Sequence, residues 1–206
     1  MSLYENYVMP HLLHLACGNQ VVDRQRTKVV PEAWGKVLEI GMGSGLNVRH
    51  YNPDKVDLVW GLEPSAGLRR KGRKVVSGVP FEVRWLDSPA EEIPLDDNSA
   101  DTVVLTYTLC TIPDWYRALE EMHRVVKPGG RLLFSEHGIS PDANVRRWQE
   151  RINPLWCKLA QGCNLNRPIP SLVTAGGFRI EHIERGYLPG TPRLVGFNYW
   201  GAAVPR

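Results

Sequence analysis

The sequence predicts a single α/β domain built on a doubly wound, mostly parallel β-sheet. Short apolar segments alternate with segments of helical spacing from about residue 37 onward, a glycine-rich turn separates the first pair, and two consecutive strand patterns come last. Strand–helix alternation is typical of a parallel sheet that helices cover on both faces. With 206 residues, 43% of them hydrophobic, the chain is long enough for one sizeable core and short for two full domains.

Seven segments have the apolar or alternating pattern of strands. They are residues 37–40, 58–63, 81–86, 102–106, 131–136, 178–184 and 194–203. No helix fits between the last two, so they must form an antiparallel hairpin, either inside the sheet or at its edge.

Helical patterns fill the intervening segments. They cover residues 46–51, 65–76, 114–126 and 142–161, and one or two short helices are expected over residues 3–22. Ser65 is a plausible N-cap, the Lys127–Gly130 turn should end the third helix, and Pro154 should kink or divide the fourth.

Composition excludes several classes of protein. The net charge of +3 is too small for a dedicated nucleic-acid binder. No run of 18 apolar residues could span a membrane, and residues 1–23 lack the basic start of a signal peptide. The four cysteines match no paired zinc spacing, so no metal site is predicted, and they fit a reduced, cytoplasmic protein. Nothing in the pattern specifies an oligomeric state.

The turn after the first strand indicates a nucleoside-like ligand. The turn contains three glycines, Gly41, Gly43 and Gly45, which can adopt positive φ angles and leave no side chain in the way of a ligand. The start of the next helix adds unpaired backbone N–H groups. In dinucleotide folds the third glycine stands where this sequence has Leu46. Glu39 would repel a pyrophosphate but suits an ammonium or sulfonium group.

An acidic residue also ends the second predicted strand. Glu63 can accept hydrogen bonds from both hydroxyls of a ribose, as the equivalent acid does in dinucleotide folds. Glu63 alone therefore does not separate a dinucleotide from a smaller nucleoside.

Four motifs in order resemble those of class I S-adenosylmethionine-dependent methyltransferases. They are Val37–Gly45, Gly61–Ser65, Ala90–Asp101 and His123–Arg131, spread over residues 37–136. The resemblance implies a Rossmann-like, seven-stranded sheet with an N-terminal helical lid. It also implies S-adenosylmethionine as cofactor, S-adenosylhomocysteine as product and a small molecule as methyl acceptor.

A shorter likeness lies in the C-terminal third. Glu136-His137, Asn153–Trp156 and Gly162–Arg167 are similar to the branch that contains the methyltransferase-like thiol methyltransferases of animals. Related bacterial enzymes act on lipid head groups or quinones. The likeness implies an apolar acceptor such as a thiol, with a phospholipid or quinone at the membrane surface as the alternative.

The resemblance assigns cofactor contacts residue by residue. The implied contacts are Glu39, Gly41, Gly43, Gly45, Glu63, Pro64, Ser88, Ala90, Glu91 and Thr106. Many relatives have an Asp directly before the position of Ala90, where it holds the adenine amino group. Here that residue is Pro89, so Asp87 or Ser88 would have to take over the contact.

The acceptor side is harder to read. His137 follows the fifth strand and either deprotonates the acceptor or orders its loop through a hydrogen bond. The candidate residues of the acceptor pocket are Tyr4, Tyr7, Cys110, His137, Trp156 and Asn164. For each of them the alternative interpretation is ordinary side-chain packing. The expected division is a lid over residues 1–30, a cofactor-binding core over 31–136 and acceptor-side helices with the hairpin over 137–206.

Two other classes compete with a methyltransferase. A nicotinamide oxidoreductase would use a similar sheet, but the glycine spacing and the terminal hairpin argue against it. A non-catalytic S-adenosylmethionine sensor would keep the cofactor site without an acceptor site. Peripheral contact with a membrane stays open, because Arg69–Lys74 is either a lipid-facing basic run or a solvated helix face.

Overall fold

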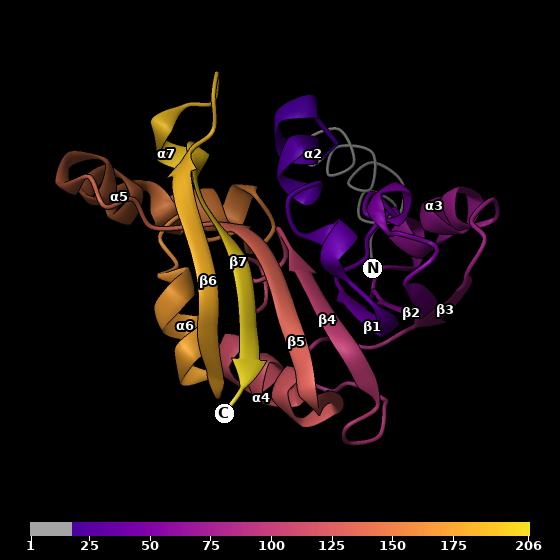
Figure 1. The fold of residues 1–206 in the computed structure, drawn as a ribbon. Helices are drawn as coiled ribbons and strands as arrows, with labels where there is room; N and C mark the ends of the chain where they lie inside the picture. Colours follow the sequence, from indigo (N-terminus) through magenta and orange to yellow (C-terminus); the bar gives the residue numbers. More distant parts are fainter. Residues whose placement is uncertain (1–17) are drawn as a thin grey trace.

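The computed structural model describes residues 18–206, which form a seven-stranded sheet in the order β3-β2-β1-β4-β5-β7-β6. The strands are β1 Gly35–Ile40, β2 Val56–Leu62, β3 Glu82–Leu86, β4 Ala100–Thr106, β5 Val126–His137, β6 Phe178–Tyr187 and β7 Phe197–Pro205. β1 to β5 pair in parallel, whereas β7 runs antiparallel to both β5 and β6 (Figure 1). The predicted fold class is therefore confirmed, and the hairpin places β7 inside the sheet.

Eight helical segments accompany these strands in the described part of the chain. Six are α-helices: α2 Gln20–Arg26, α3 Ala66–Val76, α4 Trp115–Val125, α5 Ala143–Leu159, α6 Ile169–Ala175 and α7 Arg193–Gly196. The other two are the 3₁₀ turns η2 Val30–Glu32 and η3 Val48–His50. The sheet edge that matters below is the one at which β1, β2, β4 and β5 end, because parallel strands present their carboxyl ends together.

Side chains of alternating orientation divide the core between the two faces of the sheet. Leu38, Val103 and Leu132 belong to the larger cluster, which includes the apolar sides of α4 and α6. Their neighbours Val37 and Val104 belong to the second cluster, together with the segment around η2. Both faces of the central strands are thus buried, as their near-continuous apolar sequences require.

The helix α4 shows how local sequence sets an element that later supports the site. Asp114 caps it by accepting a hydrogen bond from the Arg117 backbone N–H at 3.0 Å. Leu119 and Met122, at helical spacing, are fully buried against the sheet. The opposite side of the helix is left for polar residues.

Three local expectations were wrong. Residues 46–51 form only the 3₁₀ turn η3, because Gly45 has a φ of +80° and Pro53 follows closely. Residues 194–196 belong to α7 rather than to the last strand, which begins at Phe197. The short helix α6 was not predicted.

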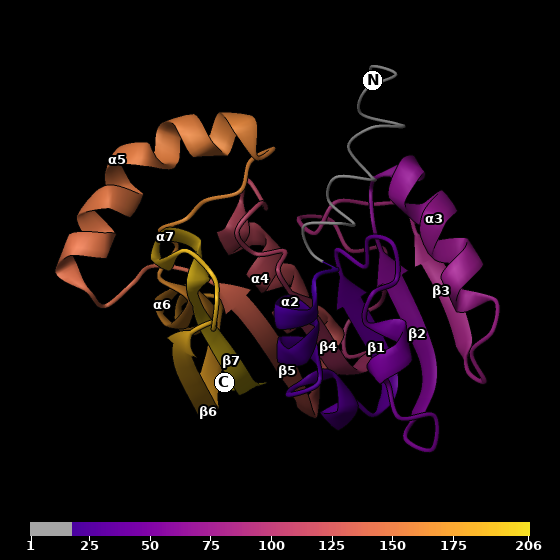
Figure 2. The ribbon, with the colours of Figure 1, turned by 90° about the horizontal axis from the view of Figure 1, so that it is seen from above.

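The helix α5 continues through Pro154 without a break. The helix is bent but uninterrupted in Figure 2, as expected of a helix that contains a proline, so the chain is not divided at Pro154. Trp148, Leu155 and Leu159 on this helix are 56%, 64% and 73% exposed. Among residues 18–206, no helix has the length and apolar character needed to cross a membrane.

Candidate functional site

A cavity of about 420 Å³ opens at the carboxyl ends of β1, β2 and β4. Its volume is in the range of small-molecule sites. Predicted cofactor residues that line it are Glu39, Gly41, Gly43, Glu63, Pro64, Ala90, Glu91 and Thr106. Gly45 and Ser88 were also predicted, but they are not among the lining residues. Other lining residues come from the same strand ends and turns, from Arg26 and Pro89, and from the loops that contain Tyr107, Thr108, Thr111, Ile112, Pro113, Ala160 and Gln161.

The glycine turn is tight for a steric reason. Gly41 and Gly43 have φ values of +63° and +60°, which are costly for residues with a side chain. A Cβ added to Gly41 would lie 2.4 Å from the Thr108 Cγ2 atom. The backbone of the turn and the loop after β4 therefore approach each other as closely as glycine allows.

Glu39 is the buried acid of the turn, with only 2% of its surface exposed. It accepts hydrogen bonds from Asn47 Nδ2 at 3.0 Å and from the Tyr51 hydroxyl at 2.7 Å. Burial raises the pKa of Glu39 to about 7, although Tyr51, Arg26 and Asn47 each oppose this shift. A cationic ligand beside Glu39 would favour its ionised form.

Asn47 joins Glu39 to the end of β4. Its Nδ2 also donates to Thr106 Oγ1 at 3.0 Å, while its buried Oδ1 has no partner within the described protein. A buried acceptor without a donor is costly. Asn47 lines the cavity, so a ligand ammonium group would supply the missing donor.

Glu63 lies across the turn from Glu39. Its Oε2 accepts the Gly43 backbone N–H at 2.9 Å, and its Oε1 accepts the Ser65 N–H at 2.8 Å. Burial raises the pKa of Glu63, and the two backbone donors partly oppose this. Each carboxylate oxygen has a second lone pair, so both can still accept a ligand hydroxyl.

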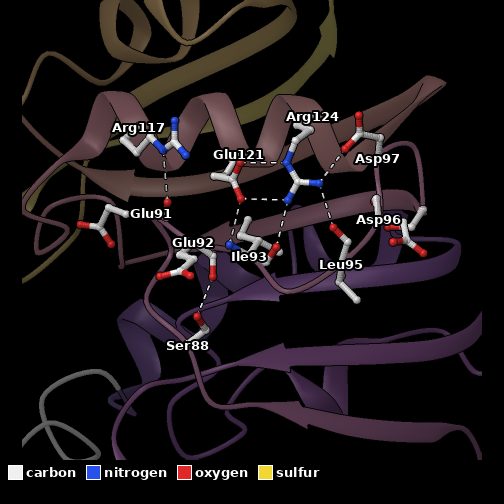
Figure 3. Close-up of polar contacts among 11 residues, drawn as sticks. Ser88, Glu91, Glu92, Ile93, Leu95, Asp96, Asp97, Arg117, Glu121 and Arg124 are labelled. Carbon is white, nitrogen blue, oxygen red and sulfur yellow. Dashed lines mark hydrogen bonds and ion pairs between the residues drawn. The ribbon is translucent and has the colours of Figure 1, made fainter.

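The loop over residues 88–97 is held from α4 (Figure 3). Arg124 forms paired hydrogen bonds with Glu121, both at 2.8 Å, and donates to the carbonyls of Ile93 at 2.9 Å and Leu95 at 2.8 Å. Glu121 in turn accepts the Ile93 N–H at 3.0 Å. This network fixes the segment that carries Ala90.

Asp87 and Ser88, the two candidates for the adenine contact, already form hydrogen bonds with other protein groups. Asp87 forms a bidentate pair with Arg69 at 2.5 Å for both contacts. The Ser88 hydroxyl donates to the Glu92 carbonyl at 2.6 Å. Neither lines the cavity, and Pro89 does.

The predicted acceptor-pocket residues split into two groups. Tyr4 and Tyr7 lie outside the described residues, as does most of the expected lid. Cys110, His137, Trp156 and Asn164 come from separate segments, but none lines the cavity. They gather instead beside its wall, around Cys163, where His137 Nε2 lies 3.3 Å from Cys163 Sγ.

This second group has an unusual electrostatic setting. Hydrogen bonds from Cys110 and His137 lower the pKa of Cys163 well below the usual thiol range, although burial opposes the shift. Burial alone would lower the pKa of His137, but its contact with Cys163 raises it. Because His137 faces Cys163, its predicted role as a base towards an acceptor stays a prediction.

Glu136 and Asn164 stabilise the same region. Glu136 Oε1 accepts the N–H groups of Thr108 and Leu109 at 2.7 and 3.0 Å, and burial raises its pKa to about 7. Asn164 donates from Nδ2 to the Cys110 carbonyl at 3.0 Å. Both residues order loops.

The cavity fits the ligand that the motifs imply. Glu39 and the unpartnered Asn47 Oδ1 suit an ammonium group, and Glu63 suits a diol. The apolar side chains of Pro89 and Ala90 suit a planar ring. Sequence reasoning missed Asn47, Tyr51 and Arg124. Arg124 lies in the motif His123–Arg131, so the sequence could have pointed to it. Asn47 and Tyr51 flank the 3₁₀ turn η3, which the sequence pattern predicted as a helix, so their positions beside Glu39 were not expected.

Comparison with known proteins agrees with this geometry. Residues 38–134 match the family described as "Methyltransferase domain". The human thiol S-methyltransferase TMT1B is 32% identical over 80% of this chain and 71% of its own length. A demethylmenaquinone methyltransferase of Clavibacter sepedonicus is 30% identical over 65% of this chain and 54% of its own.

A solved structure supports the fold. A possible histamine N-methyltransferase of Thermotoga maritima superposes with a TM-score of 0.67 at 21% identity, over 98% of both chains. Fold likeness at this identity carries no information on the acceptor. The cavity at the strand ends, the family match and the human relative together show that the chain belongs to the class I S-adenosylmethionine-dependent methyltransferases and uses S-adenosylmethionine as its cofactor.

Proposed function

We propose that this methyltransferase methylates the sulfur of a small, apolar thiol. The observation that carries the proposal is the likeness to the human thiol S-methyltransferase, which extends over 80% of this chain and so must include part of the acceptor side, residues 137–206. The demethylmenaquinone methyltransferase covers less, at 65%.

The cofactor contacts follow from the cavity. Glu39 and Asn47 bind the amino-acid end, Glu63 accepts the ribose hydroxyls, and Gly41 and Gly43 provide bare backbone beneath the ligand. Pro64, Ala90, Glu91 and Thr106 complete the wall, whereas Gly45 shapes the turn without lining it. The bound cofactor supplies a methyl group that its sulfonium already activates.

The acceptor wall favours a neutral molecule. The lining residues that follow Thr108 in the chain and are not implied cofactor contacts are uncharged: Thr111, Ile112, Pro113, Ala160 and Gln161. The protein's task is to align the acceptor sulfur with the methyl group and to exclude water, and alignment of this kind can be worth about 7–11 kcal/mol. The division into a lid (1–30), a cofactor core (31–136) and an acceptor part (137–206) is part of this proposal.

A methyl-transfer assay with labelled S-adenosylmethionine tests the proposal. We expect alkyl and aryl thiols to be methylated, and the alcohols and amines of the same carbon skeleton to be poor acceptors. Calorimetric titration with S-adenosylhomocysteine and with NAD serves as the binding control. Selective methylation of an amine or phenol would overturn the choice of thiol.

A second candidate acceptor is a quinone or phospholipid at a membrane surface. The exposed apolar side chains of α5 favour it, since Trp148 and Leu159 lie on the same helix as Arg147 and Arg151. Assays with quinol-loaded anionic vesicles separate this candidate from soluble thiols. A chain that binds S-adenosylhomocysteine but methylates none of these acceptors would instead be a sensor.

A further inference from the structure

Three side chains that can bind a soft metal ion converge beside the acceptor wall. Cys110 follows β4, His137 is the last residue of β5, and Cys163 follows α5. Their ligand atoms all lie within 4.8 Å of one another, and His137 Nε2 is 3.3 Å from Cys163 Sγ. Among the described residues, Cys110 and Cys163 are not joined by a disulfide to each other or to Cys157.

The spacing is close to that of a tetrahedral zinc site. Zinc bonds of about 2.3 Å to sulfur and about 2.0–2.1 Å to nitrogen place sulfur and nitrogen ligands about 3.6 Å apart, and two sulfur ligands about 3.8 Å apart. The His137–Cys163 distance of 3.3 Å already has this value within a few tenths of an ångström. Small rotations about the thiol side-chain bonds would bring the third ligand into range.

The backbone of all three residues is fixed. Asn164 donates from its backbone N–H and from Nδ2 to the Cys110 carbonyl, at 2.9 and 3.0 Å, which joins the segments of Cys110 and Cys163. His137 pairs with Asn198 of β7 in the sheet. A pre-formed ligand set of this kind loses little conformational entropy when it binds a metal.

The local charges are compatible with a divalent cation. Arg167 is close enough to interact electrostatically with Cys110 and Cys163, and a nearby cation opposes metal binding. Two thiolates, however, neutralise the two charges of the ion, and the buried Glu136 carboxylate adds a further acidic group. Hard cations such as Mg²⁺ and Ca²⁺ require oxygen ligands, which this set does not provide.

We propose that Cys110 Sγ, His137 Nε2 and Cys163 Sγ form a Cys₂His site for Zn²⁺. Spacing along the sequence could not reveal it, because the three ligands come from three segments that only the fold brings together. In this arrangement His137 is a metal ligand rather than a base.

Three protein ligands leave one coordination position for water or substrate, as in catalytic zinc sites. Residues 111 and 161, near Cys110 and Cys163 in the chain, line the cavity. We extend the proposal, which here rests on the proposed function, to binding of the acceptor thiol at this position. The thiol loses its proton to water on binding the zinc. Its sulfur then bonds the methyl carbon as the carbon–sulfonium bond breaks, and water replaces the thioether product.

Metal content of the full chain tests the site itself. After reconstitution with Zn²⁺ and dialysis, elemental analysis should give about one zinc per chain for the wild type and for the control variant Cys157→Ser, which removes a free thiol of α5 outside the cluster. Cys110→Ser and Cys163→Ser should each weaken zinc affinity at least about 100-fold in competition with a chromophoric chelator. Titration with S-adenosylhomocysteine checks that these variants are folded.

Two results of the zinc measurement would overturn the site. One is a wild type that retains no zinc; the other is a Cys163→Ser variant that retains as much as the wild type. A Cys110–Cys163 disulfide in peptide maps of protein kept under cytosol-like reducing conditions would also contradict it, because such a pair cannot bind the metal.

Cobalt substitution tests the acceptor step separately. Ethanethiol should change the visible absorption of the Co²⁺-loaded protein, and ethanol, the matched control, should not. An unchanged spectrum would overturn acceptor binding at the metal and leave the zinc site standing. Zinc binding without methylation of any thiol would overturn the proposed function instead.

Discussion

Two buried carboxylates near the carboxyl ends of the parallel strands, one on the cofactor side and one on the acceptor side, differ in their hydrogen bonds. On the cofactor side, Glu39 faces the cavity and both of its oxygens accept side-chain hydrogen bonds. On the acceptor side, Glu136 accepts two backbone N–H groups through Oε1, and its Oε2 has no partner within the described protein. Burial raises both pKa values to about 7. The carboxylate on the cofactor side is thus hydrogen-bonded through both oxygens, whereas the carboxylate on the acceptor side has one oxygen without a partner in the described protein.

The largest expected effect is on the glycine turn. Gly41→Ala should weaken binding of S-adenosylhomocysteine by about 100-fold or more, because the added Cβ meets Thr108 at 2.4 Å in a left-handed backbone conformation. Gly129→Ala is the matched control: its φ is +83°, but a Cβ there meets nothing within 4 Å. Calorimetry measures the affinity of both variants for S-adenosylhomocysteine. Equal losses of affinity would contradict the prediction, because they would show that a left-handed backbone strained by a side chain is enough, without a clash at Thr108.

The next effect concerns the loop that α4 holds. Arg124→Ala should lower the free energy of unfolding by about 2 kcal/mol, since it removes the ion-pair partner of Glu121 and the donor of two loop carbonyls. Chemical denaturation measures the loss. Arg84→Ala, which breaks only an exposed pair with Glu82, should leave the denaturation midpoint close to that of the wild type. A similar cost for both variants would mean that the network does not support the loop.

A smaller effect on cofactor-product affinity should distinguish Glu39 from Glu136. Glu39→Gln should weaken binding of S-adenosylhomocysteine about tenfold, and Glu136→Gln should leave it within about twofold. The wild-type affinity should also rise with pH through about 7, because the ligand ammonium prefers ionised Glu39. A Glu39→Gln variant with an unchanged pH profile would contradict the assignment.

The raised pKa of Glu39 makes ligand affinity increase with pH, but it makes the stability of the ligand-free protein decrease with pH. A carboxyl whose folded pKa is raised holds its proton more tightly in the folded state. The stabilisation from Glu39 is therefore complete below about pH 4.5 and is lost as the pH rises through about 7. Urea titrations between pH 5 and 8 should show the wild type losing stability relative to Glu39→Gln as the pH rises.

The smallest effect is expected on α5. Trp148→Ser and Leu159→Ser should each change the free energy of unfolding by less than about 0.5 kcal/mol, because both side chains are mostly exposed. If the membrane-surface candidate holds, the same variants lose sedimentation with anionic vesicles. A large loss of stability would show that this side of α5 packs against another part of the chain.

Sequence alone predicted the cofactor side better than the acceptor side, for a physical reason. The turn at Gly41 and the acid at Glu63 are local features, each set within a few residues of a strand end. The network around Arg124 and the cluster at Cys163 depend on contacts between distant segments. Even on the cofactor side, the short 3₁₀ turn that presents Asn47 and Tyr51 was predicted as a full helix.

The position of β7 bears on how the molecule folds. β7 is the last strand in chain order, yet it lies between β5 and β6 and joins β6 to the sheet. Strands β1 to β4 can pair as they leave the ribosome, whereas the acceptor-side edge must wait for residues 197–205. A nascent chain should therefore acquire affinity for S-adenosylhomocysteine before β6 is anchored, and non-local pairing of β7 should be the slow step.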